Sequence, residues 1–432
     1  MSQPTVQFAA MDLPPRVHFN PRDSSFRLDP YSHYKRLRET EPVYYSTMGV
    51  WFLAGYDDVN AALRDRRLAA QDIPSQVQRK SEFLRARSIS PGQRSNLDAL
   101  VANSRNWFVF KDPPDHTRLR RTVAKAFQRR PVETMRPYVR SSARSLLSPL
   151  MSKRHIDLVK DFSAHLPVNV IATLFGFPSA DFEKLAGWAE RLPRIFDPLV
   201  SFEELETLDR ASREFKAYLD DICAEKRARP QSDLLSALVV AHDEQGQLSD
   251  DELMSTCIMT FSAGEESTAA MLGNGSLALI NDRDRTDELR AHPDLLSQAV
   301  EELMRYDGPL QMTCRTAKED LEIGGKLIRK GQAIYLLLGS ANRDPARFPN
   351  PDALNWHRPR VEHIAFGAGH HACVGATLAR VELEEAFRVL LEILPDLELT
   401  EEPQWRDHLV IRGMTSLPVQ RRTPRLEALS SA

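Results

Sequence analysis

A single cysteine, Cys373, lies in a glycine-rich segment directly before a predicted helix over residues 376–394. The amide groups and the dipole at the start of a helix lower the pKa of a thiol, so this position favours a thiolate. Gly367, Gly369 and Gly375 let backbone N–H groups approach the sulfur, and such hydrogen bonds tune a metal that a thiolate binds. These residues therefore indicate a thiolate ligand. A buried structural cysteine is the simpler alternative for an isolated cysteine.

The segment Phe366–Gly375 has the pattern Phe-x-x-Gly-x-x-x-Cys-x-Gly, which resembles the haem-binding loop of cytochrome P450 enzymes. In that family the cysteine is the axial ligand of haem iron, and the thiolate favours O–O cleavage. The resemblance implies haem b as the cofactor, Cys373 as the ligand of its iron, and Phe366 and Gly367 beside it. A zinc site made from Cys373 and the nearby histidines is disfavoured, because the segment lacks the Cys-x-x-Cys or His-x-x-x-His spacing of tetrahedral sites.

Glu302 and Arg305 are three residues apart, so they share one face of a predicted helix over residues 293–306. Exposed pairs of this kind are common and contribute little to stability. In context the pair resembles the Glu-x-x-Arg pair that lies upstream of the cysteine in cytochrome P450 enzymes. The resemblance implies a structural role, in which the pair holds a proline-rich segment around Arg358 beneath the haem.

His116 and Arg120 are four residues apart on one face of a helix that follows a proline-containing start signal. Two donors on one face suit an anionic carboxylate, although a solvated basic face has the same pattern. The resemblance implies that His116, Arg120, Arg315 and His371 bind the haem propionates, because buried carboxylates need paired donors.

Small and polar residues interrupt an apolar helix predicted over residues 249–281. Ala263 and Gly264 reduce side-chain volume, so a flat ligand or dioxygen can approach the backbone there. The segment resembles the oxygen-activation motif of the family, with Glu266 as the acid and Ser267 as the alcohol that deliver protons. Local capping or a solvent-facing stripe is the plain alternative. The family usually has threonine at the position of Ser267. Serine keeps the hydroxyl but lacks the methyl group that restricts the rotamers of threonine. We therefore expect looser coupling of reductant consumption to product formation.

By family position, substrate contacts come from several separate segments. Most of these side chains are apolar, which implies a lipophilic small-molecule substrate, although core packing explains many of them equally well. The predicted contacts are Phe108, Val109, Phe196, Leu199, Thr260, Leu310, Met312 and Met414.

The predicted helix that carries His116 is strongly basic. In the family this helix borders the cysteine side of the haem, where the electron donor docks. The resemblance therefore implies a ferredoxin or flavodoxin partner with its reductase, attracted by charge, while a solvated helix face explains any single residue as well. The basic residues are Lys111, Arg118, Arg121, Lys125, Arg129 and Arg130.

The 432 residues are 42% hydrophobic and 27% charged, as in an ordinary globular protein. The net charge of −3 gives no sign of bulk binding to nucleic acid. Four widely spaced cysteines indicate a reducing compartment, and we expect a cytoplasmic protein. No signal peptide and no apolar stretch of roughly 20 residues are present, so we expect no membrane partner. Since eukaryotic members of the resembled family usually carry a membrane anchor, we expect a soluble member of bacterial type.

Most of the chain is predicted to be helical, and the order of its elements resembles the family from about residue 30 to residue 424. We therefore expect one domain over residues 30–424, mainly α with small β-sheets and with a long central helix over the haem. Residues 1–29 are expected to be an N-terminal extension and residues 425–432 a tail. Residues 70–106 show no clear period and are predicted to be a long loop with short helices. Further helices are predicted over residues 30–40, 115–127, 131–151, 158–175, 179–192, 203–227 and 232–242.

Together these features indicate a haem-dependent monooxygenase that inserts one oxygen atom from O₂ into a lipophilic molecule, by hydroxylation or epoxidation. A role in secondary metabolism is implied by resemblance alone. Two alternatives stay open. A peroxide-driven peroxygenase would keep the fold, but the pair of Glu266 and Ser267 argues against it. A non-catalytic haem-binding protein is disfavoured because every catalytic position is retained.

Overall fold

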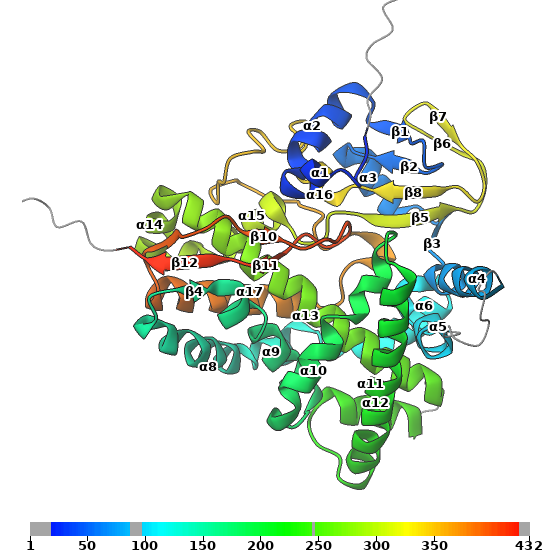
Figure 1. Ribbon diagram of the computed structural model, residues 1–432, viewed down its shortest axis with the longest axis horizontal. Coiled ribbons are helices and arrows are strands. Elements are labelled where there is room, and N and C mark those ends of the chain that lie inside the picture. Colours follow the sequence, from blue (N-terminus) through cyan, green and yellow to red (C-terminus); the bar gives the residue numbers. More distant parts are fainter. Residues whose placement is uncertain (1–18, 87–96, 244–246, 423–432) are drawn as a thin grey trace, which may run out of the picture.

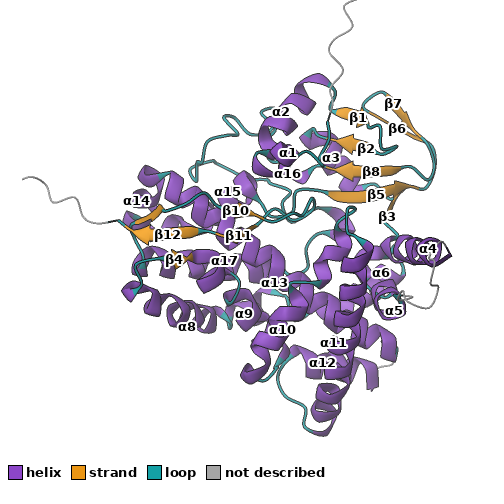
Figure 2. Cartoon of the chain, viewed as in Figure 1, coloured by secondary structure: helices purple, strands orange, loops and turns teal. Residues whose placement is uncertain are grey.

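The computed structural model describes residues 19–86, 97–243 and 247–422. Helices fill most of the molecule, and the largest sheet lies at one end of it, beside α2, α3 and α16 (Figures 1 and 2). The helices are α1 (Ser24–Leu28), α2 (Pro30–Thr40), α3 (Tyr56–Arg64), α4 (Ile73–Ala86), α5 (Asp98–Arg105), α6 (Asp115–Ala124), α7 (Arg129–Glu133), α8 (Arg136–Leu147), α9 (Leu166–Phe175), α10 (Phe182–Ala189), α11 (Phe202–Ala228), α12 (Leu234–Asp243), α13 (Asp250–Asn281), α14 (Arg283–Ala291), α15 (Leu296–Asp307), α16 (Leu338–Ala341) and α17 (Ala376–Ile393). The prediction of a mainly helical protein with small sheets is confirmed.

The strands form four small sheets. The largest has the order β1-β2-β8-β5-β3, in which β2 and β8 are parallel and the other pairs are antiparallel. The others have the orders β4-β12-β9, β6-β7 and β10-β11. The strands are β1 (Val43–Tyr45), β2 (Trp51–Leu53), β3 (Leu68–Ala70), β4 (Ile156–Asp157), β5 (Thr313–Ala317), β6 (Leu321–Ile323), β7 (Lys326–Ile328), β8 (Ala333–Leu336), β9 (Leu397–Leu399), β10 (Gln404–Trp405), β11 (Met414–Ser416) and β12 (Pro418–Arg421).

The central helix α13 begins where the sequence predicts it. The Ser249 hydroxyl accepts a hydrogen bond from the Glu252 N–H, and the Glu252 carboxylate accepts one from the Ser249 N–H, which completes the capping box. Its 32 residues extend about 48 Å at 1.5 Å per residue. A Cβ at Gly275 would lie 2.5 Å from the Phe387 ring of α17, so glycine lets the two helices approach closely. The helix that follows the cysteine segment is thus packed directly on the central helix.

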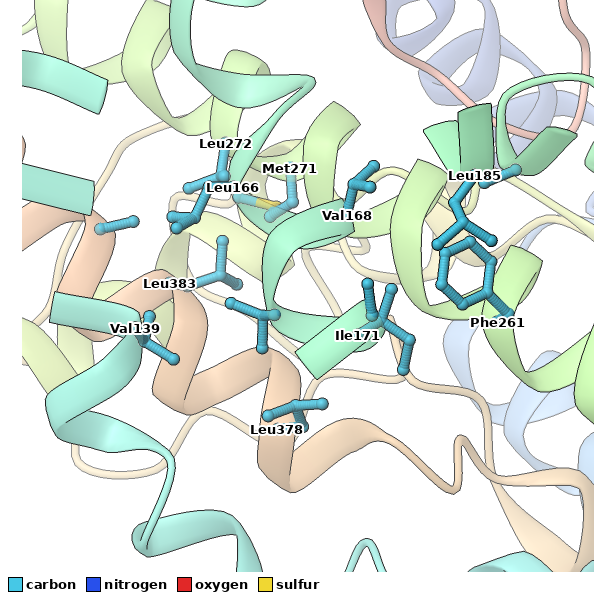
Figure 3. Close-up of a cluster of buried hydrophobic side chains, with 14 of the residues drawn as sticks. Val139, Leu166, Val168, Ile171, Leu185, Phe261, Met271, Leu272, Leu378 and Leu383 are labelled. Atoms are coloured by element: carbon cyan, nitrogen blue, oxygen red, sulfur yellow. The ribbon is translucent and has the colours of Figure 1, made fainter. Parts of the chain in front are cut away.

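The main core joins α8, α9, α13 and α17 (Figure 3). Val139, Leu166, Ile171, Leu272 and Leu383 are all buried there, with at most 1% of each side chain exposed. Burial of one such side chain stabilises the fold by about 1.5–3 kcal/mol. These apolar side chains therefore hold α8, α9, α13 and α17 together in one core.

Several element predictions are wrong in detail. Residues 56–64 and 283–291 form α3 and α14, which were not predicted. Within the segment predicted as a long loop with short helices, the described residues 73–86 and 98–105 form α4 and α5. Residues 158–175 are not one helix, because a π-helical turn over Val159–Ser163 precedes α9. Pro167 at the start of α9 has no N–H, which suits a new helix start and not a continuous helix.

The fold begins before the predicted boundary at residue 30. Phe19 and Phe26 are each 4% exposed and pack edge-on, at 5.6 Å between ring centroids. Phe19 also meets Phe52 of β2 at 5.1 Å, so residues 19–29 belong to the core around the main sheet. Among the described helices, none combines the length and the apolar composition needed to cross a bilayer.

Glu382 on α17 is a charged residue type in an apolar environment. It is 2% exposed, and its Oε2 has no hydrogen-bond partner among the described residues. Burial raises the pKa of Glu382 well above its ordinary value of 4.5. The folded protein therefore holds this proton at pH values where the unfolded chain has released it.

We expect Glu382→Gln to become more stable relative to the native chain as pH rises above about 4.5. A folded-state pKa above the unfolded one makes the native chain lose stability as pH rises, by up to about 1.4 kcal/mol per pH unit until the folded pKa is reached. The glutamine variant lacks this loss. Urea unfolding across pH 5 to 8 measures the difference.

The control is Glu392→Gln on the same helix, where the carboxylate is 53% exposed and pairs with Arg144. This substitution should change stability by less than about 1 kcal/mol, with little dependence on pH. A constant difference between Glu382→Gln and the native chain would contradict a buried, protonated Glu382.

Candidate functional site

Cys373 lies between a 3₁₀ turn, η7 (Gly369–His371), and the first residue of α17. Its N–H donates to the Phe366 carbonyl at 2.8 Å, which closes the segment. Gly369 has φ +69°, and a Cβ there would lie 2.7 Å from the Leu63 carbonyl at the end of α3. Glycine is therefore required at this position both by the backbone conformation and by close packing.

Cys373 is an exposed residue, yet protein atoms surround its thiol closely enough to desolvate it. Burial raises its pKa, while the N–H groups of Gly375 and Ala376 and the guanidinium of Arg120 lower it. The predicted effect of the helix start is present, but the predicted net decrease is wrong for the free thiol because desolvation is larger. Coordination to a metal would deprotonate the thiol outright.

Four predicted carboxylate-binding residues come from three separate segments and meet beside Cys373. His116 and Arg120 are on α6, Arg315 is on β5 and His371 is in the cysteine segment. The rings of His116 and His371 are 4.3 Å apart between centroids. Burial, followed by the charges of nearby arginines, lowers the pKa of His116 to about 4 and that of His371 to about 2. Both imidazoles are therefore neutral at pH 7.

This basic cluster has buried polar atoms without partners. Both ring nitrogens of His116 and the Nε2 of His371 have no hydrogen-bond partner among the described residues. Arg315 is 6% exposed and donates to the Thr313 hydroxyl and the Cys314 carbonyl, with no ion pair among the described residues. A buried guanidinium and unsatisfied imidazoles are costly unless an anionic ligand supplies acceptors. The cluster therefore suits carboxylate groups of a ligand.

One narrow strip of the central helix is open. Between residues 253 and 276, Ala263, Gly264 and Ser267 are the positions that are not buried. They lie on one face, at spacings of one and four residues, and the Ser267 hydroxyl donates to the Ala263 carbonyl at 3.3 Å. A Cβ at Gly264 would lie 3.1 Å from Ile171 Cδ1, so this glycine also permits the packing of α9. Small residues on the open face of a buried helix make room for a ligand.

Two carboxyl groups are buried next to this strip. Burial raises the pKa of Glu266 to about 7, while Arg406 lowers it. Burial, and then the charge of Glu266, raise the pKa of Glu265 to about 8. Glu266 Oε1 lies 3.2 Å from Arg406 Nη1, and its Oε2 has no partner among the described residues. A carboxyl group that titrates near neutral pH can both release and regain a proton.

Glu302, Arg305 and Arg358 form one buried ion cluster. Arg305 donates two hydrogen bonds of 2.8 Å to the Glu302 carboxylate, and Arg358 Nε donates to the same carboxylate at 3.0 Å. Both side chains of the helical pair are completely buried. Five backbone carbonyls accept from the two arginines, those of Asn342, Pro349, Asn350, Pro351 and Ala353. The cluster therefore fixes the irregular segment that leads to the cysteine.

Some predicted substrate contacts gather in the structure. Phe108 and Val109 lie in a 3₁₀ turn, η1 (Phe108–Phe110), and the Phe108 ring is 6.1 Å from His116. Phe196 packs on Phe110 of the same turn at 5.3 Å. Thr260, one helical turn before the open strip, is 4% exposed and its hydroxyl has no partner among the described residues.

The other predicted contacts have different surroundings. Met312 is 1% exposed and packs in the cluster around the main sheet, and Met414 reaches within 3.2 Å of a Cβ at Gly273, about 15 Å along α13 from Ala263. Leu199 is 37% exposed, and Leu310 pairs with Ile411 in an isolated β-bridge. Both methionines are buried in hydrophobic clusters of the fold.

Arg406 is a site residue that sequence reasoning missed. It lies 140 residues from Glu266, in a segment with no recognisable motif. Arg380 was also missed, and its guanidinium lies 4.5 Å above the Phe366 ring. The contact of Arg406 depends on a segment that only the tertiary fold brings to α13, whereas Arg380 lies on α17, seven residues after Cys373.

Comparison with known proteins gives a consistent result. Residues 77–404 match the protein family described as Cytochrome P450. The polyketide biosynthesis cytochrome P450 PksS of Bacillus subtilis (strain 168) is 36% identical, over 94% of this chain and 98% of that protein. The 6-deoxyerythronolide B hydroxylase of Saccharopolyspora erythraea is 35% identical, over 92% and 97%. The crystal structure of CalO2 superimposes with a TM-score of 0.86 at 32% identity, over 94% of this chain and 99% of that one.

The chain therefore belongs to the cytochrome P450 family and is an oxidoreductase of the monooxygenase type that binds haem b. The residues present fit that group: a thiol at a helix start, a basic cluster with unsatisfied buried donors beside it, and an open strip on the central helix. Bound haem supplies the dioxygen chemistry, and the residues of the protein orient the cofactor and the substrate and handle protons.

Proposed function

We propose that the Cys373 thiolate binds the haem iron and that His116, Arg120, Arg315 and His371 bind the haem propionates. The observation that carries this proposal is the basic cluster beside Cys373, whose buried donors have no acidic partner among the described residues except the nearby Asp112. Asp112 already accepts the Ala70 N–H at 3.1 Å. Propionate carboxylates would satisfy donors that are otherwise costly to bury. Phe366 and Gly367 would border the ring on the cysteine side, and Ala263 and Gly264 on the opposite side.

We also propose that the substrate is a lipophilic molecule of secondary metabolism. The residues that gather near the basic cluster and the open strip are mostly aromatic or aliphatic, and bulky apolar ligands bind in such surroundings. The relatives support the same class, because PksS is named for polyketide biosynthesis and the Saccharopolyspora erythraea enzyme for hydroxylation of 6-deoxyerythronolide B. Hydroxylation or epoxidation is the proposed reaction.

A titration of the haem-loaded protein with pools of polyketide, macrolide and fatty-acyl compounds tests this function. We expect at least one pool to shift the Soret band from the low-spin to the high-spin position, because a bulky apolar ligand displaces water from the iron. Cys373→Ala, as the matched control, should lose the thiolate spectral signature. A haem spectrum that no pool changes would contradict the lipophilic substrate, and failure to bind haem after reconstitution would contradict the role of Cys373.

Glu266 and Ser267 are proposed to deliver protons to the open side of the site. Glu266 titrates near neutral pH, and Ser267 exposes a hydroxyl on the open strip one residue away. The hydroxyl can donate its proton and be reprotonated from the carboxyl group through water. The Thr268 hydroxyl instead donates to the Gly264 carbonyl from a buried position.

We expect Ser267→Ala to lower the product formed per electron consumed by at least about twofold, because proton delivery loses its hydroxyl group. Ser267→Thr should raise this yield above that of the native chain, since the added methyl group restricts the rotamers. Product, reductant and hydrogen peroxide are measured together. Thr268→Val is the control and should leave the yield unchanged. An unchanged yield in Ser267→Ala would remove Ser267 from the proton path.

A ferredoxin or flavodoxin is the proposed electron donor, docking beside the cysteine segment. Phe127 lies 3.8 Å from a Cβ at Gly375, so the exposed side chains around it border that segment. Arg121, Lys125, Arg129 and Arg130 are exposed there and form no ion pair among the described residues. Arg118, which the sequence placed in the same group, is instead paired with Glu252.

We expect the double variant Arg121→Glu, Lys125→Glu to slow ferredoxin-supported reduction at low salt by at least about tenfold, because attraction becomes repulsion. The difference should shrink at high ionic strength. A matched control, Lys326→Glu with Arg329→Glu, makes the same change in net charge on the exposed β6-β7 hairpin and should have little effect. Equal rates for both double variants would exclude docking at Arg121 and Lys125.

A further inference from the structure

The segment between β10 and β11 brings a cation to the central helix. Gly413 makes this possible, because a Cβ there would lie 2.8 Å from the Ala270 Cβ on α13. The Arg406 N–H donates to the Gly413 carbonyl at 2.9 Å, and its Nε donates to the Met414 carbonyl at 3.3 Å. These hydrogen bonds to the backbone position the Arg406 guanidinium next to Glu266.

Arg406 holds Glu266 by one oxygen only. Its Nη1 lies 3.2 Å from Glu266 Oε1, while Glu266 Oε2 is buried and has no partner among the described residues. A carboxylate with one oxygen fixed by a cation has a defined orientation and keeps the other oxygen for proton exchange. A second acid, Glu190, lies 3.8 Å from Arg406 Nη2 on the outer side and is 66% exposed.

Arg406 also lines a small cavity on the side of the β10-β11 segment. Its lining includes Gln311 and His408, which are 3% and 6% exposed. Gln311 Oε1 and His408 Nε2 both lack a hydrogen-bond partner among the described residues. Arg27, which also lines the cavity, is 34% exposed, so the cavity extends to the surface. Unsatisfied donors and acceptors around a cavity of this kind suit ordered water.

We propose that Arg406 is a positioning residue for Glu266, and that water in the cavity that Arg406 lines supplies the proton that Glu266 regains after each transfer. This inference rests on the proposed function of Glu266 as the proton-delivering acid. In one cycle the Glu266 carboxyl group gives its proton toward Ser267, the resulting carboxylate is stabilised by the Arg406 guanidinium, and a proton from cavity water restores the acid.

The charges around Glu266 agree with this arrangement. Burial raises the pKa of Glu266 to about 7, Arg406 opposes this most strongly, Arg194 also lowers it, and Glu190 raises it. Glu265, the neighbour on α13, is itself buried with its pKa raised to about 8. Without Arg406 the carboxyl group would keep its proton at neutral pH, because a buried carboxylate without a cation is strongly disfavoured.

Infrared titration of the haem-loaded protein tests the proposal without turnover. The carbonyl band of the protonated acid is assigned to Glu266 by its loss in Glu266→Gln and its retention in Glu265→Gln. We expect Arg406→Gln to raise the titration midpoint by at least about one pH unit and Arg406→Lys, which keeps the charge, to raise it by much less. An unmoved midpoint in Arg406→Gln would overturn the proposal. If that variant does not fold, Arg406→His above pH 8, where imidazole is neutral, gives the same test.

A double-mutant cycle that measures product formed per electron distinguishes the positioning role of Arg406 from the proton-delivering role of Glu266. We expect Arg406→Gln to lower this yield by at least about twofold in the native chain and to have no further effect in the Glu266→Gln background. Equal losses in both backgrounds would mean that Arg406 acts elsewhere and would overturn the inference alone. If Glu266→Gln itself leaves the yield unchanged, the proposed role of Glu266 fails, and the positioning role fails with it.

Discussion

The buried ion cluster of Glu302, Arg305 and Arg358 fixes the geometry on which the site depends. One carboxylate satisfies two guanidinium groups, and those groups in turn satisfy the backbone carbonyls of residues 342–353. This irregular backbone leads directly to the cysteine segment and has no regular secondary structure over residues 344–363 to hold it. Loss of one partner from a buried ion pair typically costs about 3–5 kcal/mol, so the arrangement is stable only when complete.

A second constraint is that the site buries titratable side chains in two clusters, one of basic residues and one of acidic residues. Burial, followed by neighbouring positive charges, lowers the pKa values of His116 and His371, and burial raises those of Glu265 and Glu266. Each cluster is costly in a low-dielectric interior unless an opposite charge is supplied. The acids receive part of that charge from Arg406, whereas the bases would receive it from the haem propionates proposed to bind there. Stability and cofactor binding are therefore linked through the same side chains.

The central helix carries the two buried acids. Between residues 253 and 276 it is buried except at the strip of Ala263, Gly264 and Ser267. Its small residues serve two purposes, since Gly264 and Gly275 admit neighbouring helices while Ala263 and Ser267 leave room on the open face. The segment between β10 and β11 packs closely on the same helix at Gly413, and this packing places Arg406 beside Glu266. The proton path proposed for Glu266 thus depends on packing between elements that are far apart in the chain.

The sequence by itself determined the chemistry-bearing groups and the long helices. The cysteine segment, the capping box of α13 and the Glu-x-x-Arg pair are local patterns of residue type and spacing, so the sequence could reveal them. The helical class followed from the same local rules. The helices within residues 70–106 and 283–291 were harder to predict from the sequence, because they lack a clear apolar period and are held mainly by tertiary contacts.

Only the tertiary structure decided which groups meet and how they titrate. Arg406 and Glu266 are 140 residues apart, and Met312 and Met414 proved to be core residues once their neighbours were known. The raised pKa of the Cys373 thiol depends on burial, which outweighs the local effect of the helix start. Desolvation and long-range ion pairs depend on distances between segments, and a linear pattern contains no such distances.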